Sequence, residues 1–387
     1  MTTVRVAGVG LTHFGVHPDR TARDLFAAAG LAALADAGVP RADVEALYYG
    51  NFIGELAEHQ GHQGPLMAEA VGVHAPASRF ENACASGGTA VRQAVLALRS
   101  GAADVVLVGG GERMNNLGTA AATGALATAA DDLYEVRAGV TFPGAYALMA
   151  RAYFAGLGGD REDLAHVAVK NHANAVPNEY AQFRREVTVE DVLGSPLLAD
   201  PLSIYDACPL TDGAAALVLV SDDYADEHDV EAPVAITGSG QGGDSLALQD
   251  RASLLATPAA ERAAAAAYAD AGITADDVAV AEVHDCFTIA EVMAVESLGF
   301  FEPGEGIGAA RRGETTRDGR IPVNLSGGLK AKGHPVGATG VSQVVEMTRL
   351  LRGDHPNSDA VDGTTGVTHN AGGTGATAFV HVLEAVA

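Results

Sequence analysis

Short apolar runs alternate with alanine-rich segments along this chain. The runs at 4–9, 47–49 and 105–108 have the composition of strands, whereas the segments at 21–37 and 87–99 have helical patterns. Strands that are apolar throughout are buried on both faces, as in sheets that helices cover on two sides. The pattern therefore predicts an α/β fold.

The second half of the chain repeats the first. Asp36-Ala-Gly-Val recurs as Asp270-Ala-Gly-Ile, and each copy closes a helix at glycine before a strand. The apolar run at 4–10 likewise has a counterpart at 234–240. We therefore predict a tandem duplication of one α/β unit.

The two halves are predicted to span residues 1–225 and 226–387, and we expect them to pack as one body because no flexible linker separates them. A segment of the first half, about 112–200, has no counterpart in the second. Its glycine, asparagine, tyrosine and proline content is typical of an elaborated loop domain with some helix. Such insertions usually carry substrate contacts.

Composition excludes several classes of protein. With 387 residues, 48% of them hydrophobic, the chain has enough apolar surface for a large core. Its three cysteines are odd in number and widely spaced, which excludes a disulfide framework and a Cys-x-x-Cys zinc site. The N-terminal residues have no signal-peptide pattern, and no apolar stretch is long enough to cross a bilayer. We expect a soluble, cytoplasmic protein that binds no membrane.

The charge balance is strongly acidic. The formal net charge is −25, and only three of the basic residues are lysines: Lys170, Lys330 and Lys332. Nucleic acid is therefore excluded as a partner. A surface so acidic and so poor in lysine indicates a halophilic protein, kept soluble in a salt-rich cytoplasm where salt screens its self-repulsion.

Cys84 is a candidate nucleophile. It follows a strand-like run, and the small residues Ala-Ser-Gly-Gly after it open a helix. A helix N-terminus lowers the pKa of a thiol, small residues admit a second group, and backbone N–H groups there can hold an oxyanion. Free cysteines are more often buried and inert, so Cys84 needs support from elsewhere in the chain.

Two further segments supply titratable side chains. An apolar run ends in His284-Asp-Cys286, and the ends of strands are where open α/β folds place their sites. The alternative is a histidine and a cysteine of the core. His334 lies in a glycine-rich turn, which favours access over packing and makes it the strongest candidate general base, the alternative being an exposed, idle histidine.

A fourth segment, the glycine-rich turn at 368–375, either offers backbone N–H donors or is an ordinary tight turn. Taken together, two cysteines and two histidines come from both halves of a duplicated fold. Cysteine and histidine together can form an acyl-enzyme and move protons. The set indicates a reaction with two acyl partners, in which one thiol is acylated and the other moves a proton on carbon.

These motifs resemble the thiolase family over essentially the whole chain. Asn82-Ala-Cys84 resembles the family's nucleophile motif, Gly333-His-Pro-Val-Gly337 its Gly-His-Pro motif, and Asp212-Gly-Ala-Ala-Ala216 a landmark strand. The resemblance implies duplicated α/β units packed as α-β-α-β-α layers with an inserted loop domain. It also implies an acyltransferase.

The pattern departs from most thiolases at two places. His284-Asp-Cys-Phe287 stands where most members have Asn-Glu-Ala-Phe, and His369-Asn-Ala-Gly-Gly373 stands where they have Cys-x-Gly-Gly. Both features resemble the sterol-carrier-protein type, which many archaeal acetyl-CoA acetyltransferases share. In that type the second cysteine has moved to the strand end.

The resemblance implies a mechanism. His334 deprotonates Cys84, which takes an acyl group from acyl-CoA; Cys286 then removes a proton from the α-carbon of a second acetyl-CoA. His284 and His334 stabilise the enolate oxygen. The product is acetoacetyl-CoA, and thiolysis is the reverse reaction.

The resemblance also implies the remaining contacts. The backbone N–H groups of Cys84 and of Ala371 or Gly372 hold the tetrahedral intermediate. Cys208 matches a family position near the pantetheine arm of the substrate, and His369 is also expected to contact substrate. Lys332 is a candidate for a different reason, since coenzyme A is a polyanion whose phosphates need cations nearby. Coenzyme A thioesters are substrates, and neither a cofactor nor a metal is expected.

Each of four alternative functions fits only part of the sequence evidence. A longer-chain 3-ketoacyl-CoA thiolase uses the same residues, and a non-catalytic acyl-CoA-binding scaffold would not need both thiols. A ketoacyl synthase lacks the second cysteine, and the Gly-x-Gly-x-x-Gly at 238–243 is a weak dinucleotide signal without the acidic residue that should follow. As partners we expect a homodimer or homotetramer, and a complex with a hydroxymethylglutaryl-CoA synthase and a small zinc-containing bridging protein.

Overall fold

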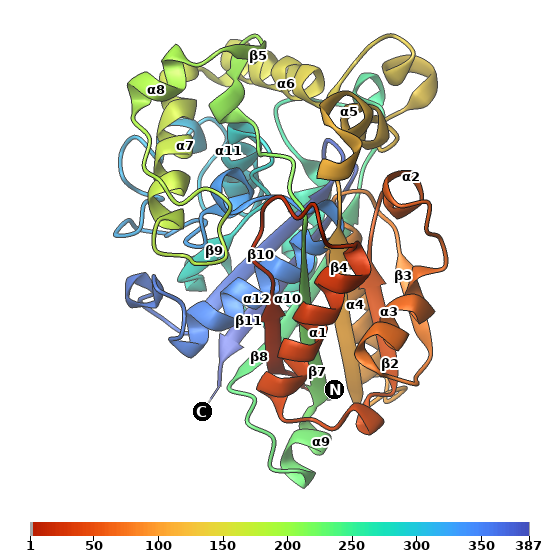
Figure 1. The fold of residues 1–387 in the computed structure, drawn as a ribbon. Helices are drawn as coiled ribbons and strands as arrows, with labels where there is room; N and C mark the ends of the chain where they lie inside the picture. The colour runs from red at the N-terminus through yellow and green to blue at the C-terminus, as the bar shows by residue number, and fades with distance from the viewer. Residues whose placement is uncertain (1–2, 387) are drawn as a thin grey trace.

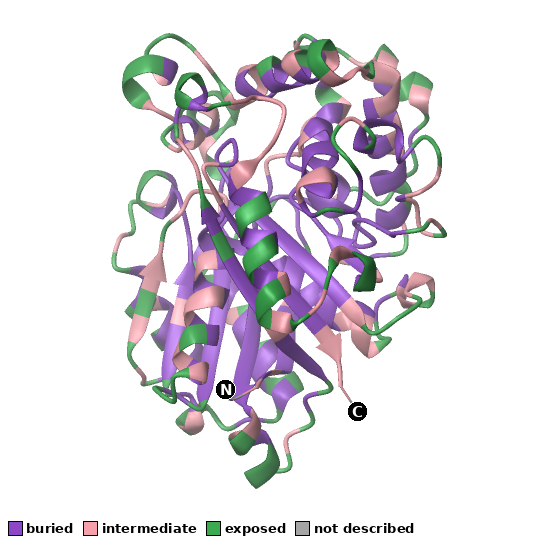
Figure 2. Cartoon of the chain, turned by 180° about the vertical axis from the view of Figure 1, so that it is seen from behind, coloured by how far each residue is buried: buried purple, intermediate pink, exposed green. Residues whose placement is uncertain are grey.

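The computed structural model describes residues 3–386, which form one nine-stranded mixed sheet covered by helices (Figure 1). The strand order is β3-β2-β4-β7-β1-β8-β11-β10-β9. The strands are β1 (Val4–Leu11), β2 (Ala46–Gly50), β3 (Ala77–Phe80), β4 (Val105–Glu112), β7 (Gly213–Ser221), β8 (Val234–Gly243), β9 (Val280–Glu282), β10 (Thr365–Gly372) and β11 (Thr377–Ala385). Figure 2 shows the inner strands buried along most of their length, as their apolar composition predicts, whereas the edge strand β3 is only partly buried.

The apolar cores between strands and helices define five layers. One core lies between the first-half strands and α1 (Ala22–Ala37) and α3 (Gln63–Val71), and a second lies between the second-half strands and α10 (Pro258–Ala271) and α11 (Thr288–Ser297). A third core surrounds α4 (Ser86–Arg99) and α12 (Thr339–Arg352), which pack together between the two groups of strands. The predicted α-β-α-β-α arrangement is confirmed.

The duplication is visible in matching contacts. In the first half a carboxylate oxygen of Asp36 accepts a hydrogen bond from the Val9 backbone N–H at 2.9 Å. In the second half Asp270 accepts from the Ser239 backbone N–H, also at 2.9 Å. Each aspartate ties the last turn of a helix, α1 or α10, to its neighbouring strand, so the repeated sequence produces a repeated packing unit.

The glycines of β8 show why its Gly-x-Gly-x-x-Gly pattern is not a dinucleotide loop. Gly238 and Gly240 lie within the strand, and a Cβ on either would collide with the backbone of α10. The pattern therefore serves close helix–strand packing, which requires a residue without a side chain.

The two halves join through a short antiparallel pairing of β1 with β8, from Val4 opposite Ile236 to Val6 opposite Val234. The predicted boundary at 225/226 falls inside the short helix α9 (Asp222–Glu227), which connects β7 to β8. The continuous sheet makes the two halves one body.

The insertion lies between β4 and β7, at one end of the sheet (Figure 1). The sequence predicts a loop domain with some helix here, and the structure contains more helix than that. Capping side chains start the two longest helices of the insertion. Thr141 accepts a hydrogen bond from the Gly144 N–H, and Asp160 forms a capping box with Asp163. Its elements are α5 (Thr119–Ala127), α6 (Phe142–Leu157), α7 (Arg161–Ala175), α8 (Val189–Gly194), β5 (Leu197–Ala199) and β6 (Leu202–Ser203). None of the described helices has the length and apolar character needed to span a membrane.

Candidate active site

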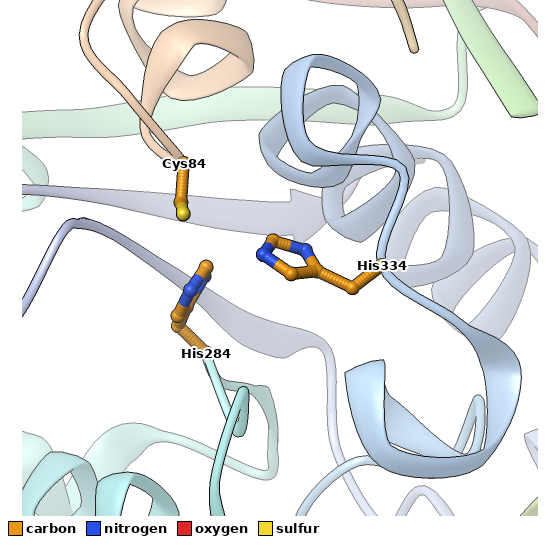
Figure 3. Close-up of side chains that lie close together, drawn as sticks. All are labelled: Cys84, His284 and His334. Atoms are coloured by element: carbon orange, nitrogen blue, oxygen red, sulfur yellow. The ribbon is translucent and has the colours of Figure 1, made fainter. Parts of the chain in front are cut away.

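Three side chains from distant parts of the chain converge at one end of the sheet. Figure 3 shows Cys84, His284 and His334 pointing toward one another. The cysteine sulfur and one nitrogen of each histidine all lie within 4.8 Å of one another. The two imidazole rings meet edge to face, with centroids 5.1 Å apart. A thiol therefore has two imidazoles within reach.

Cys84 is presented by a tight turn between β3 and α4. Ala83, just before it, has a φ of 50°, a left-handed conformation that costs energy in a residue with a side chain. Ser86 holds the turn: its hydroxyl accepts from the Asn82 N–H at 2.9 Å and donates to the Ala83 carbonyl at 2.6 Å. The turn directs Cys84 toward the two histidines.

Burial controls the reactivity of this thiol. The helix N-terminus was expected to lower its pKa, but burial raises the pKa of Cys84 to about 12, and the negative charge of Glu112 acts in the same direction. Hydrogen bonds from the backbone N–H groups of Gly373 and Cys84 offset part of this effect on the pKa. Cys84 is therefore a neutral thiol in the free protein and needs a base to react.

Hydrogen bonds to two threonines hold the backbone and the ring of His334 in place. Its backbone N–H donates to the Thr211 hydroxyl at 3.0 Å, and its Nδ1 lies 2.7 Å from the Thr339 hydroxyl. Its side chain is buried, which excludes an idle surface histidine, and burial lowers the pKa of His334 to about 3. The ring is neutral, and its Nε2 side is left to face Cys84 (Figure 3).

The buried carboxylate of Glu112, at the end of β4, positions the glycine-rich turn that follows His334. It accepts hydrogen bonds from the backbone N–H of Gly337 at 2.9 Å and of Phe52 at 3.0 Å. Residues from both halves of the chain are thereby tied together beside the base.

His284 and Cys286 lie in the loop after β9, and both are buried. Burial, followed by the nearby rings of His334 and His369, lowers the pKa of His284. Burial also raises the pKa of Cys286, while a hydrogen bond with the Tyr146 side chain opposes that rise. Like Cys84, Cys286 is therefore a neutral thiol in the free protein.

The residue between them, Asp285, ties this loop to the segment that leads to His334. Its carboxylate accepts from the Leu329 backbone N–H at 2.6 Å and from the Asn171 amide at 2.7 Å. One buried carboxyl group therefore ties the loop that carries His284 and Cys286 to the segment that carries His334.

A cavity of about 260 Å³ opens beside these groups. Its wall contains all three cysteines of the chain, because the Cys208 backbone N–H donates to the Cys286 carbonyl at 2.9 Å and so aligns the two segments. The rest of the wall is mainly apolar. It includes Phe52, Met114, Leu126, Phe142, Tyr146, Leu198, Phe287, His334 and Val336.

Two family models match the chain: "Thiolase, N-terminal domain" over residues 4–223 and "Thiolase C-terminal domain-like" over residues 240–385. The chain belongs to the thiolase family. This confirms the resemblance drawn from the nucleophile and Gly-His-Pro motifs.

Individual relatives agree with this thiolase assignment. The chain is 45% identical over 385 residues to "Acetyl-CoA acetyltransferase" of Methanothermobacter thermautotrophicus, covering 99% of this chain and 100% of that protein. It is 31% identical over 388 residues to human "Sterol carrier protein 2", covering 96% of this chain and 70% of that protein. The solved structure "Ltp2-ChsH2(DUF35) aldolase" aligns with a TM-score of 0.86 at 27% identity, over 99% of this chain and 98% of that one.

The structure brings most of the expected side chains to the thiolase cavity. Cys84, Cys208, Cys286 and His334 line it, and His284 faces Cys84 and His334. Most of the apolar wall was not predicted as site residues, and two groups of it lie against the thiols. Tyr146 comes from α6 in the insertion, and the Gly373 N–H, beyond the expected Ala371 and Gly372, faces the thiol. Tyr146 carried no sequence signal, because only the fold brings α6 to the thiols, whereas Gly373 lies in the glycine-rich turn at 368–375 that was a candidate source of backbone N–H donors.

Two expected substrate contacts lie elsewhere. Lys332 is 1% exposed, with its ammonium 3.7 Å from a carboxylate oxygen of Glu346 and above the Phe14 ring, so its position is that of a buried ion pair. His369 lies behind the site, where its Nδ1 accepts from the His284 backbone N–H at 3.5 Å. Together with Ala371, His284 and Tyr146 it lines a small second cavity of only about 20 Å³ on the far side of His284.

Cys84, His284 and His334 also form the one group in residues 3–386 whose donor atoms are close enough to hold a metal ion. One sulfur and two imidazole nitrogens suit zinc. A metal would occupy the sulfur on which acyl transfer in a thiolase depends, so metal binding and covalent chemistry exclude each other here.

Proposed function

We propose that this protein is an acetyl-CoA acetyltransferase, which condenses two acetyl-CoA to acetoacetyl-CoA and coenzyme A and catalyses the reverse thiolysis. The observation that carries the proposal is that Cys84, Cys286 and His334 line one cavity, with a nitrogen of His284 within 4.8 Å of the Cys84 sulfur. Two thiols and two neutral imidazoles match a reaction that needs a nucleophile, two proton carriers and an oxyanion donor.

In the first step the acetyl group of acetyl-CoA is transferred to the enzyme and coenzyme A is released. His334 takes the proton of Cys84, and the sulfur attacks the thioester carbonyl carbon. The bond from that carbon to the sulfur of coenzyme A breaks, and Cys286 gives its proton to the departing sulfur. The products are acetyl-Cys84, free coenzyme A and a Cys286 thiolate.

In the second step the Cys286 thiolate removes a proton from the α-carbon of another acetyl-CoA. The carbanion attacks the acetyl carbonyl of Cys84, and the bond from that carbonyl carbon to the Cys84 sulfur breaks. Cys84 recovers its proton from His334, which completes the cycle. His284 and His334 donate to the enolate oxygen. The N–H groups of Cys84 and Gly373, which face the sulfur, serve the tetrahedral intermediate in place of the Ala371 or Gly372 N–H that the sequence predicted.

A second candidate is a 3-ketoacyl-CoA thiolase for longer acyl chains. The apolar wall beside Cys84 favours it, since α5 contributes Leu126 and the segments around it contribute Met114 and Phe142. Comparing kcat/KM for acetoacetyl-CoA with that for 3-ketoacyl-CoA of increasing length separates the two candidates.

Thiolysis of acetoacetyl-CoA by coenzyme A tests the proposal. Cys84→Ala is expected to abolish both thiolysis and covalent acetylation of the protein, because of the three cysteines in the cavity wall only Cys84 is grouped with nitrogens of both His284 and His334. Cys286→Ser is expected to reduce condensation by about 10²–10⁴-fold, the usual contribution of a positioned acid or base. Loss of acetoacetyl-CoA measures the reaction, and intact-protein mass spectrometry measures the acetyl group.

The outcomes separate the roles of the two thiols. Thiolysis that survives Cys84→Ala contradicts the covalent mechanism. Full condensation by Cys286→Ser moves the proton-carrying role to another residue, of which His369 is the next candidate.

We also propose that the protein works as a homo-oligomer. β3 is an edge strand of the sheet, with one side paired to β2 and its other side free among the described residues. An edge of this kind offers backbone groups to a second copy. Light scattering in solution tests this, and a monomer at working concentration contradicts it.

The proposal extends to larger assemblies. The solved structure with a TM-score of 0.86 is titled as an aldolase of two named components, which supports a search for partners of this chain. Co-purification with a hydroxymethylglutaryl-CoA synthase and a small zinc-containing protein tests the complex, and recovery of the chain without either one contradicts it.

A further inference from the structure

Asn370, in β10, lies buried between the nucleophile and His284. Its amide nitrogen donates to the Cys84 carbonyl at 3.0 Å and to Nδ1 of His284 at 3.1 Å. Its amide oxygen accepts from the Gly88 backbone N–H at 3.1 Å. One side chain therefore contacts the nucleophile's backbone, the first turn of α4 and a catalytic imidazole.

The chemistry of these partners determines which way the amide faces. The Gly88 N–H can only donate, and the Cys84 carbonyl can only accept. Turning the amide by half a rotation would place two oxygens together and two N–H groups together. The NH₂ group of Asn370 must therefore face His284.

This contact decides where His284 carries its proton. Because Nδ1 accepts from Asn370, a neutral ring must hold its single proton on Nε2. The ring is neutral, since burial and the neighbouring imidazoles of His334 and His369, the titratable groups that act on it, lower its pKa. Nε2 is buried and has no hydrogen-bond partner in the described part of the chain, so it is a donor ready for a substrate.

His334 has the opposite arrangement. The Thr339 hydroxyl donates to the Pro335 carbonyl at 3.0 Å, and its oxygen then accepts from Nδ1 of His334 at 2.7 Å. With its proton on Nδ1, the His334 ring leaves Nε2 free to accept the proton of Cys84. Two imidazoles whose centroids are 5.1 Å apart thus take different roles, one as base and one as donor.

We propose that Asn370 is a positioning residue that keeps the proton of His284 on Nε2, so that this ring donates to the oxygen of the thioester that Cys286 deprotonates. The inference rests on the proposed thiolase reaction and adds the residue that makes His284 a donor. Loss of one such donor costs about 10²–10³-fold in rate. A catalytic histidine left with its proton on the wrong nitrogen costs about 10⁴-fold in a serine protease.

Asn370→Asp tests this directly, because a carboxylate of the same shape accepts where the amide donates. The proton of His284 then moves to Nδ1, and Nε2 can no longer donate. We expect kcat for condensation to fall by at least about 100-fold. Acetylation of Cys84 by acetyl-CoA, followed by mass spectrometry, should fall much less, since it relies on backbone N–H donors. If both steps fall equally, Asn370 has only a structural role and the proposal is overturned.

A readout that needs no activity follows the proton itself. In protein labelled with ¹⁵N-histidine, the His284 signals are assigned by their loss in His284→Gln. Wild type should show Nδ1 unprotonated and Nε2 protonated, and Asn370→Asp should show Nδ1 protonated. A protonated Nδ1 in wild type, or a proton that stays on Nε2 alone in Asn370→Asp, overturns the proposal. Absence of thiolysis in wild type would instead reject the proposed function, whatever the spectra show.

Asn357→Asp is the matched control. Asn357 is also buried, and its amide donates to two carbonyls, of Asn174 at 3.0 Å and Leu325 at 2.7 Å, away from the cavity. The same change there should lower the melting temperature and leave the ratio of acetylation to condensation as in wild type. If Asn370→Asp does not fold, Asn370→Ala is used in its place. Nδ1 of His284 then loses its donor, so the proton of the His284 ring should be shared between Nδ1 and Nε2. A ¹⁵N-histidine spectrum identical to that of wild type overturns the proposal.

Discussion

At the scale of single residues, the free protein holds its reactive groups in their neutral forms. Burial raises the pKa of Cys84 to about 12 and lowers the pKa of His334 to about 3. A thiolate–imidazolium pair is therefore unfavourable in the empty cavity. Proton transfer from sulfur to imidazole becomes productive only when the sulfur attacks a thioester, which ties the chemistry to bound substrate.

Because Cys84 is a neutral thiol in the free protein, we expect its alkylation to be slow at neutral pH and to become faster as the pH rises. Because only the thiolate reacts, and its pKa is near 12, the rate with iodoacetamide should rise about tenfold per pH unit from pH 7 to 10. Mass spectrometry of the peptide that contains Cys84 distinguishes it from Cys208 and Cys286. A plateau in the rate below pH 9 would show that the thiol is activated before substrate arrives.

At the scale of elements, close packing of strand on helix explains several residues that the pattern left unexplained. Gly240 of β8 faces the backbone of α10 at Ala263 and Ala267, and Gly10 of β1 faces α1 in the same way at Ala29. Both helices approach their strands at glycine, so the duplicated sequence preserves a duplicated contact. A wider approach would separate the layers that carry the site.

Gly240→Ala is therefore expected to destabilise the protein by about 1–3 kcal/mol or more, since the added methyl group meets helix backbone that cannot rotate away. Gly124→Ala is the matched control: Gly124 is exposed within α5, with open space around its Cβ position, and alanine there should stabilise by about 0.5–1 kcal/mol. Free energies of unfolding in urea measure both variants. Equal stability of Gly240→Ala and wild type would reject the packing argument.

The elements themselves could largely be predicted. The apolar runs at 4–9 and 105–108 became β1 and β4, and the helical patterns at 21–37 and 87–99 became α1 and α4. The insertion was harder, because its helices α6 and α7 begin at capping residues and lie among prolines and glycines that resemble loop. Local periodicity identifies an element only where one side of it is consistently buried.

At the scale of the whole molecule, charge is unevenly distributed. The net charge is −25, yet all three lysines, Lys170, Lys330 and Lys332, are buried. Lys170, for example, lies 2.9 Å from a carboxylate oxygen of Glu291. Arginine therefore supplies the positive side chains of the described surface, and acidic groups outnumber them.

Added salt should weaken the repulsion between the many carboxylates on this surface. We expect the melting temperature to rise between 0.1 and about 3 M KCl, because screening shortens the range of repulsion between carboxylates. Scanning calorimetry across this range measures the effect. A melting temperature that stays flat or falls would contradict the halophilic interpretation.

The sequence alone determined the fold class, the duplication, the thiolase family and the main reactive residues, because periodicity and short motifs are local properties of the chain. Only the tertiary structure decided how those residues act. It withdrew the half-buried Cys84 sulfur from water and so raised its pKa, placed Lys332 in an ion pair and not at the cavity, and brought Tyr146 and the Gly373 N–H to the site. It also placed Asn370 against His284. The proton position on an imidazole depends on what lies next to each nitrogen, and residues distant in sequence become neighbours only through folding.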